Sequence, residues 1–233
     1  MKRNRNSGIR YYMAEIVILI FGISISFLLN EWRLNSQAKR EQIKLLEDFQ
    51  ANLKTDSLAI SQIVKNLEIQ QKASLTLLQL KADNVFSDST TLNFLRTLSY
   101  SPFTPTQITY EQMKSLGASD LIENDSLAKQ LVSLYEVSYK NVSEWTGIDG
   151  AHVKETLIPY TSQHMPFALY LNYSAMDANN KKRFMLELQK DELKYILQFL
   201  LIYKASTKAV FDATAKSIAQ LLHRIDQELM ILD

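Results

Sequence analysis

The stretch LEDFQANLKTDSLAISQIVKNLEIQQKASLTL, Leu46 to Leu77, places an apolar residue at almost every turn of a helix and contains neither Gly nor Pro. A heptad row drawn from Leu46 is apolar at seven of its ten positions, and Asp56, Gln70 and Ser74 are the exceptions. Residues at this spacing share one helix face. Since the stretch free of Gly and Pro extends from Glu31 to about Asp83, we expect a long amphipathic helix over residues 33–83, continuous with the segment before it.

The C-terminal end of the chain mirrors this pattern. Residues 181–232 again lack Gly and Pro, and a row drawn from Leu193 to Leu232 is apolar at eight of twelve positions. The piece YILQFLLIY (195–203) is apolar nearly all round, so we expect it to be the most buried part of the chain, although it is too short to cross a membrane. Two helices of this length most simply pack antiparallel.

The segment between them carries all four prolines and three of the five glycines. We expect several shorter helices there, one capped by Asn124 or Asp125 and ending near Gly147, and another capped by Asp149 and stopped at Pro159. Period-two alternation is nearly absent, so no substantial sheet is expected.

The predicted fold class is therefore all-α. An N-terminal transmembrane helix leads into a long helix, a long C-terminal helix packs antiparallel to it, and a helical head is inserted between the two. The predicted divisions are a basic tail, a transmembrane helix, an amphipathic stalk, a head of shorter helices and loops, and a C-terminal helix on the stalk. In residue numbers they are 1–10, 11–32, 33–83, 84–180 and 181–233.

The segment AEIVILIFGISISFLLNEW, Ala14 to Trp32, reads as the membrane helix. From Tyr12 to Trp32 it would span roughly 30 Å, the thickness of a bilayer's hydrocarbon core. Tyr11, Tyr12 and Trp32 lie at its ends, where amphipathic rings favour the headgroup layer. A cleaved signal peptide and a buried helix are the alternatives, but no small-residue cleavage site follows.

The charges flanking this segment bear on its orientation. Four Lys or Arg residues precede it within residues 1–10, and four more follow it more sparsely, diluted by acidic residues, within residues 33–48. Because basic residues favour the cytoplasmic side, we expect a cytoplasmic N-terminus and a periplasmic C-terminal domain in a bacterial inner membrane.

One side of the predicted membrane helix is polar or small. At about 100° per residue, Glu15, Gly22, Ser26 and Asn30 fall within roughly 80° of one another, and we call them the small-residue stripe. Gly22 and Ser26 form a small-xxx-small pair, which lets helix backbones approach closely. The stripe therefore favours a helix–helix interface. For Glu15 three readings stand: a hydrogen bond across that interface, a carboxylate that reaches the headgroups, and proton or ion transfer.

Little in the sequence indicates catalysis. The chain has no cysteine, its three histidines are far apart, and it has no phosphate-binding glycine motif and no nucleophile elbow. A net charge of +1 gives no support to nucleic-acid binding. We expect no enzyme, no cofactor and no metal site, and we make no prediction about a small-molecule ligand.

Aromatic residues in two predicted loops are the candidates for a partner surface. They are Phe103, Tyr160, Phe167, Tyr170 and Tyr173. The alternative is that these rings cap the helical head. Tyr135 and Tyr139 share one face of a predicted helix, where core packing competes with a ligand pocket.

Two stretches resemble a bacterial family of uncharacterised single-pass membrane proteins. The first holds Glu15-Ile, Gly22-Ile and the exit Asn30-Glu-Trp32, and the second runs from Tyr110 through Gly117, Leu121-Ile and Asn124 to Leu134-Tyr135. The resemblance covers residues 11–50 and 100–140, with Ala14 in place of the usual Gly and Leu116 in place of a frequent Ser. It implies a membrane anchor and a helical domain, and it implies no activity.

These observations predict a membrane-anchored scaffold or accessory subunit that self-associates or joins a membrane-protein partner. The alternative function is a ligand-sensing helical bundle that relays a signal through its transmembrane helix to a partner. A pocket lined by Tyr135, Tyr139 and the loop aromatics would favour that alternative.

Overall fold

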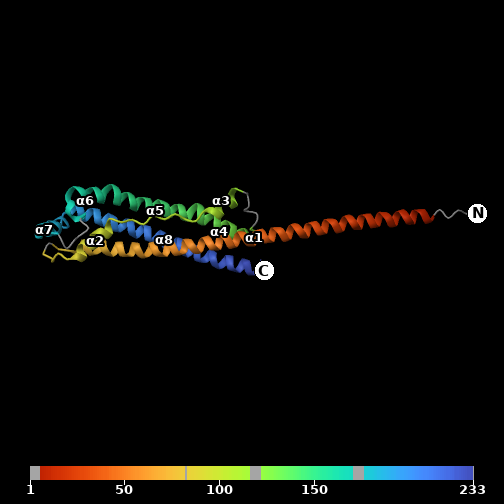
Figure 1. Cartoon of the computed structure of the whole chain (residues 1–233), viewed down its shortest axis with the longest axis horizontal. Helices are drawn as coiled ribbons and strands as arrows, with labels where there is room; N and C mark the ends of the chain where they lie inside the picture. Colours follow the sequence, from red (N-terminus) through yellow and green to blue (C-terminus); the bar gives the residue numbers. More distant parts are fainter. Residues whose placement is uncertain (1–5, 82, 116–121, 170–175, 233) are drawn as a thin grey trace, which may run out of the picture.

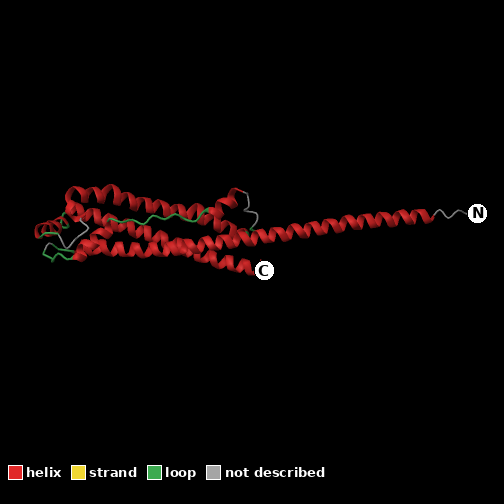
Figure 2. Ribbon diagram, viewed as in Figure 1, coloured by secondary structure: helices red, strands yellow, loops and turns green. Residues whose placement is uncertain are grey.

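The structure, a computed structural model, describes residues 6–81, 83–115, 122–169 and 176–232, with residues 6–12 and 14 described by their backbone alone. Within these ranges every regular element is a helix and none is a strand, as predicted (Figure 2). The elements in chain order are α1 (Asn6–Gln79), α2 (Asp88–Thr97), α3 (Ile108–Ser115), α4 (Asp125–Ser133), η2 (Leu134–Ser138), α5 (Tyr139–His152), η3 (Val153–Leu157), α6 (Ile158–His164), η4 (Pro166–Leu169), α7 (Ala178–Glu187) and α8 (Asp191–Leu232).

The unbroken helix α1 has two parts (Figure 1). Its N-terminal part extends beyond the rest of the molecule, and from Met13 to Glu41 no described side chain is buried. From Gln42 onward it is one helix of a bundle. It is the one helix in the described part of the chain that is long and apolar enough to cross a membrane, judged by length and composition. The predicted continuity of the apolar and amphipathic segments is confirmed.

Helix α8 packs antiparallel to the part of α1 that lies in the bundle, as predicted. Lys208 pairs with Glu68 at 3.3 Å, and Gln50 donates to Asp226. These two contacts give the register of the antiparallel pair: residues at the same height on α1 and α8 have residue numbers whose sum is 276. The predicted rows face this core, because nine of the ten positions on α1 and ten of the twelve on α8 are buried. The polar members Asp56, Gln70 and Ser74 are buried along with the apolar ones.

Two expectations for the C-terminal helix need correction. Helix α8 begins at Asp191 rather than near residue 181, because α7 ends at Glu187 and Gln189 turns to donate its side-chain amide to Leu80 O at 3.0 Å. The piece at 195–203 is not the most buried part either. Leu197 and Leu200 face the core, but Tyr195 is 62% exposed, since no described helix covers that side of α8.

Residues 125–164 form one continuous helical rod rather than two helices. Asn124 caps its start, accepting from Leu127 N at 3.1 Å, as predicted. Two π-helical turns, η2 and η3, interrupt the α-helical geometry without ending the rod. The expected cap at Asp149 is wrong, because Asp149 lies inside α5. The expected stop at Pro159 is also wrong, because Pro159 lies in the first turn of α6, directly after the π-helical turn η3, and the rod continues to His164.

An extended segment completes the bundle. Residues 98–107, which we call the strap, join α2 to α3 without regular structure and run lengthwise along the helices (Figure 2). Apolar packing forms two clusters along the bundle, one around Phe49 and Phe211 near the protruding part of α1, and one around Phe94 and Phe184 at the far end.

Candidate functional site

A layer of buried polar side chains lies between the two apolar clusters. On α8 it falls between Leu200 of the far cluster and Phe211 of the near one, and the same change occurs along α1 and α5. We call this set the polar layer. Its members are Gln70, Ser74, Thr146, Asp149, Lys204 and Thr207.

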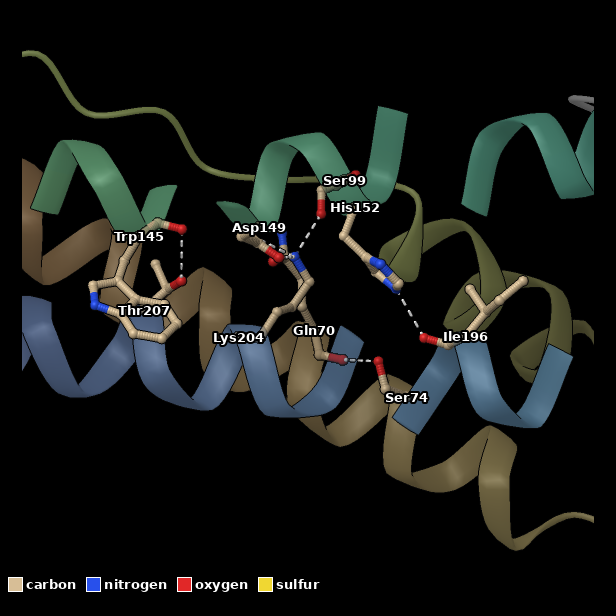
Figure 3. A network of polar contacts seen from close by, with 9 residues as sticks. All are labelled: Gln70, Ser74, Ser99, Trp145, Asp149, His152, Ile196, Lys204 and Thr207. Atoms are coloured by element: carbon tan, nitrogen blue, oxygen red, sulfur yellow. Dashed lines mark hydrogen bonds and ion pairs between the residues drawn. The ribbon is translucent and has the colours of Figure 1, made fainter. Parts of the chain in front are cut away.

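An ion pair forms the centre of the polar layer (Figure 3). Lys204 Nζ lies 2.9 Å from each carboxylate oxygen of Asp149, and the two side chains are 0% and 1% exposed. The same ammonium group donates to Ser99 O of the strap at 2.9 Å. Burial raises the pKa of Asp149, which the Lys204 charge opposes, and burial lowers the pKa of Lys204 despite its carboxylate partner. The two bonds within the pair and the third bond, from Lys204 to Ser99 O, therefore compensate for the loss of hydration.

Neighbouring contacts tie α5 and α8 together around this pair (Figure 3). Thr207 Oγ1 donates to Trp145 O at 3.2 Å, and the His152 Nε2 atom lies 3.0 Å from Ile196 O. His152 thus serves helix packing. Among the described residues no group of three or more His, Cys, Asp or Glu side chains could hold a metal ion.

A second buried carboxylate holds the other end of the strap. Asp56 of α1 accepts from Thr106 N at 3.0 Å and from Thr106 Oγ1 at 2.8 Å. The Tyr139 hydroxyl donates to the same carboxylate at 2.6 Å, and the Tyr135 hydroxyl donates to Thr106 O at 3.2 Å. Burial, followed by the hydrogen bond to Asp56, raises the pKa of Tyr139, so this hydroxyl stays a donor.

The strap, α3 and the rod enclose a groove of about 470 Å³. Its aromatic side includes Tyr110 and Tyr135, whose rings stack at 4.5 Å, and the half-buried Phe103. At its rim Glu136 accepts from Tyr110 Oη at 2.8 Å and from Lys114 at 3.0 Å, and it also pairs with Lys140. The hydrogen bonds from Lys140, Lys114 and Tyr110 lower the pKa of Glu136 to about 2. The groove therefore combines aromatic walls with a fully ionised rim.

The small-residue stripe lies on the protruding part of α1. All four of its residues are exposed, and Gly22, Ser26 and Asn30 line a shallow groove of about 450 Å³ along the helix with Ile18, Leu19, Ile23 and Phe27. A Cβ atom added at Gly22 would meet no atom within 4 Å apart from the adjacent residues and the backbone of its own helix. Trp32 is 70% exposed, and the side chains of Tyr11 and Tyr12 lie outside the described ones.

The predicted aromatic partner surface is not exposed where the structure describes it. Tyr160 and Phe167 are each 6% exposed and belong to the far apolar cluster, and Phe103 packs against Phe211 at 5.7 Å. The expected exposure is therefore wrong for Tyr160 and Phe167, because α7 packs against both. The Tyr160 hydroxyl donates to Glu187 at 2.8 Å, and Arg183 lies 4.7 Å from the centre of the Phe167 ring. Tyr170 and Tyr173 lie outside the described residues.

Sequence reasoning missed the polar layer, although its signal was present. Lys204 and Thr207 interrupt the apolar row of the C-terminal helix, and a lysine at a core position requires a counter-ion. Its partner Asp149 was assigned to a helix cap. Because 55 residues separate the two, no local pattern links them.

Residues 15–148 match a family of unknown function, DUF6090. The chain belongs to that family. The match covers α1 from the stripe onward, the strap, and the rod to the start of the polar layer, and it includes most of both stretches on which the family resemblance rested. No curated protein and no solved structure matches the chain. Membership of DUF6090 therefore carries no activity to this protein.

Proposed function

We propose that this DUF6090 chain is a single-pass protein of the bacterial inner membrane that serves as a scaffold or accessory subunit of a membrane complex. In this proposal the apolar part of α1 spans the bilayer, the N-terminus is cytoplasmic and the bundle is periplasmic. Its partner is a second copy or another membrane protein that packs on the small-residue stripe.

The observation that carries this proposal is the direction in which the stripe faces. Helix α1 is continuous, so the rotation between two of its residues follows from their separation. At about 100° per residue, Phe49 on the bundle side lies roughly 180° from Gly22 and roughly 140° from Ser26. The stripe therefore faces away from the bundle, and a partner helix can approach it without meeting the bundle.

The local chemistry of the stripe supports helix contact. Ser26 Oγ donates to Gly22 O at 2.9 Å, so the hydroxyl is already satisfied in an apolar medium. The absent side chain at Gly22 leaves the backbone open to close approach. In this proposal the Glu15 side chain hydrogen-bonds across the interface.

Substitution of the stripe tests the proposal with a matched control. Ser24 Oγ donates to Ile20 O at 2.8 Å, as Ser26 does to Gly22, but Ser24 lies on the opposite side of the helix. We expect Gly22→Leu and Ser26→Leu to reduce the complex recovered by cross-linking from native membranes, and Ser24→Leu to leave it unchanged. Equal recovery from all three variants would remove the stripe from the interface. An inactive C-terminal alkaline phosphatase fusion would reverse the proposed orientation.

One observation favours ligand sensing as a second candidate function. Tyr139, which lines the groove, donates directly to Asp56 of α1, the helix that also holds the apolar segment. A ligand that shifts Tyr139 would therefore act on α1. Ser143→Trp, which fills the groove, should abolish the rise in melting temperature that such a ligand gives the wild type; an equal rise in both proteins would place the ligand elsewhere.

A further inference from the structure

The strap is fixed at both ends by buried charged residues. At one end Lys204, paired with Asp149, holds Ser99 O at 2.9 Å. At the other end Asp56 receives both Thr106 N and Thr106 Oγ1. These anchors come from all three long elements, because Lys204 belongs to α8, Asp149 to α5 and Asp56 to α1.

The strap has little slack between its anchors. Level residues on α1 and α8 have numbers adding to 276, so Lys204 is level with position 72 of α1, sixteen residues beyond Asp56. At 1.5 Å per residue the anchors lie roughly 24 Å apart along the bundle. The seven steps from Ser99 to Thr106 reach at most about 23–25 Å when fully extended. A shift of the strap by one residue would therefore break an anchor.

The middle of the strap packs against the near apolar cluster through Phe103. Phe103 packs at 5.7 Å from the rings of both Tyr139 and Phe211, which belong to the near cluster. Between Tyr100 and Thr104 no backbone N–H donates to a backbone group of another residue that the structure describes. Side-chain anchors and the rings of Phe103 and Tyr100, rather than a ladder of hydrogen bonds, thus hold the segment in place.

We propose that the strap is a latch, by which we mean a segment held in place by two anchors: the buried Asp149–Lys204 pair at Ser99 and Asp56 at Thr106. In this proposal the anchors fix the position of the strap and contribute little to the stability of the bundle. Replacing a buried ion pair by apolar residues often leaves stability unchanged, while removing one partner is costly. The latched strap supplies Phe103, Thr104, Pro105 and Gln107 to the groove, so the groove has its observed shape only while both anchors hold.

The test separates position from stability in the full chain in detergent. The double variant Asp149→Leu/Lys204→Met should melt near the wild-type temperature. Chymotrypsin should cut it after Tyr100 and Phe103 at least about tenfold faster, because cleavage follows the population of the released strap. The control variant Lys208→Met/Asp212→Leu removes a partly exposed pair from the same helix, together with the Lys208 contact to Glu68 of α1. It should leave both cuts at the wild-type rate.

A folded double variant cut at the wild-type rate would overturn the proposal. If the double variant does not fold, inserting Gly-Ser between Thr104 and Pro105 gives the strap slack without touching an anchor or either scissile bond. That variant should keep its helix content and become sensitive at the same two bonds, and unchanged resistance there would again overturn the latch.

Discussion

At the scale of single residues, Glu136 at the groove rim makes the clearest pH-dependent contribution. Its pKa lies at about 2 in the folded protein, below the ordinary value of 4.5, because two lysines and Tyr110 favour the carboxylate. A lowered pKa adds stability above the ordinary value, and this contribution is lost as the pH falls from 4.5 toward 2. We expect urea midpoints of the wild type to fall more steeply than those of Glu136→Gln across this window. Parallel curves would contradict the assignment.

Single residues also show which contacts the sequence pattern predicts and which it does not. The heptad row placed Asp56, Gln70 and Ser74 in the core, and they are buried. Their partners were beyond prediction. Asp56 meets Tyr139 across 83 residues, and Lys204 meets Asp149 across 55, so these contacts depend on how the rod packs against the long helices. The burial of Tyr160 and Phe167 was not predicted for the same reason, because a predicted loop does not reveal which distant element will cover its side chains.

At the scale of elements, the long helices were predictable and the rod was not. Apolar periodicity and the absence of Gly and Pro are local signals, and they predicted the packed parts of α1 and α8. The rod passes through two glycines, a proline and two π-helical turns. Each π-turn adds a residue to one helical turn and shifts the face that follows, which periodicity does not reveal. Packing of α5 on α8 overrides these local breaks.

Two glycines of α5 provide a matched test of how closely the strap packs on this helix. Ala at Gly147 would meet no atom within 4 Å, so Gly147→Ala should raise stability by about 0.5–1 kcal/mol through its helix propensity. Ala at Gly150 would lie 3.1 Å from the Tyr100 ring of the strap, which also lies 4.5 Å from Lys154 Nζ. Gly150→Ala should therefore raise stability by less than Gly147→Ala does, or lower it. The denaturant midpoints of the two variants measure this difference. An equal increase in both midpoints would show that the strap is not packed on α5.

At the scale of the whole molecule, the bundle and the apolar segment share one helix. The bundle begins at Gln42, ten residues beyond Trp32, so about 15 Å of single helix separates them. Nothing in the described chain packs on that interval. A scaffold needs only a tether there, whereas a relay needs a rigid link. The stiffness of residues 33–41 therefore bears on which proposed function holds.

Spin labels measure this stiffness directly, because the chain has no native cysteine. Labels at Leu29→Cys and Lys54→Cys, 25 residues apart on a straight helix, should give a narrow distance distribution near 38 Å. Adding Ser36→Pro, which removes a helical hydrogen bond at a half-buried position outside the bundle, should shorten and broaden it, while Ser36→Ala should not. The bundle should melt at the same temperature in both variants, since Ser36 lies outside it. A broad distribution in the parent protein would contradict a rigid link and leave α1 as a tether only.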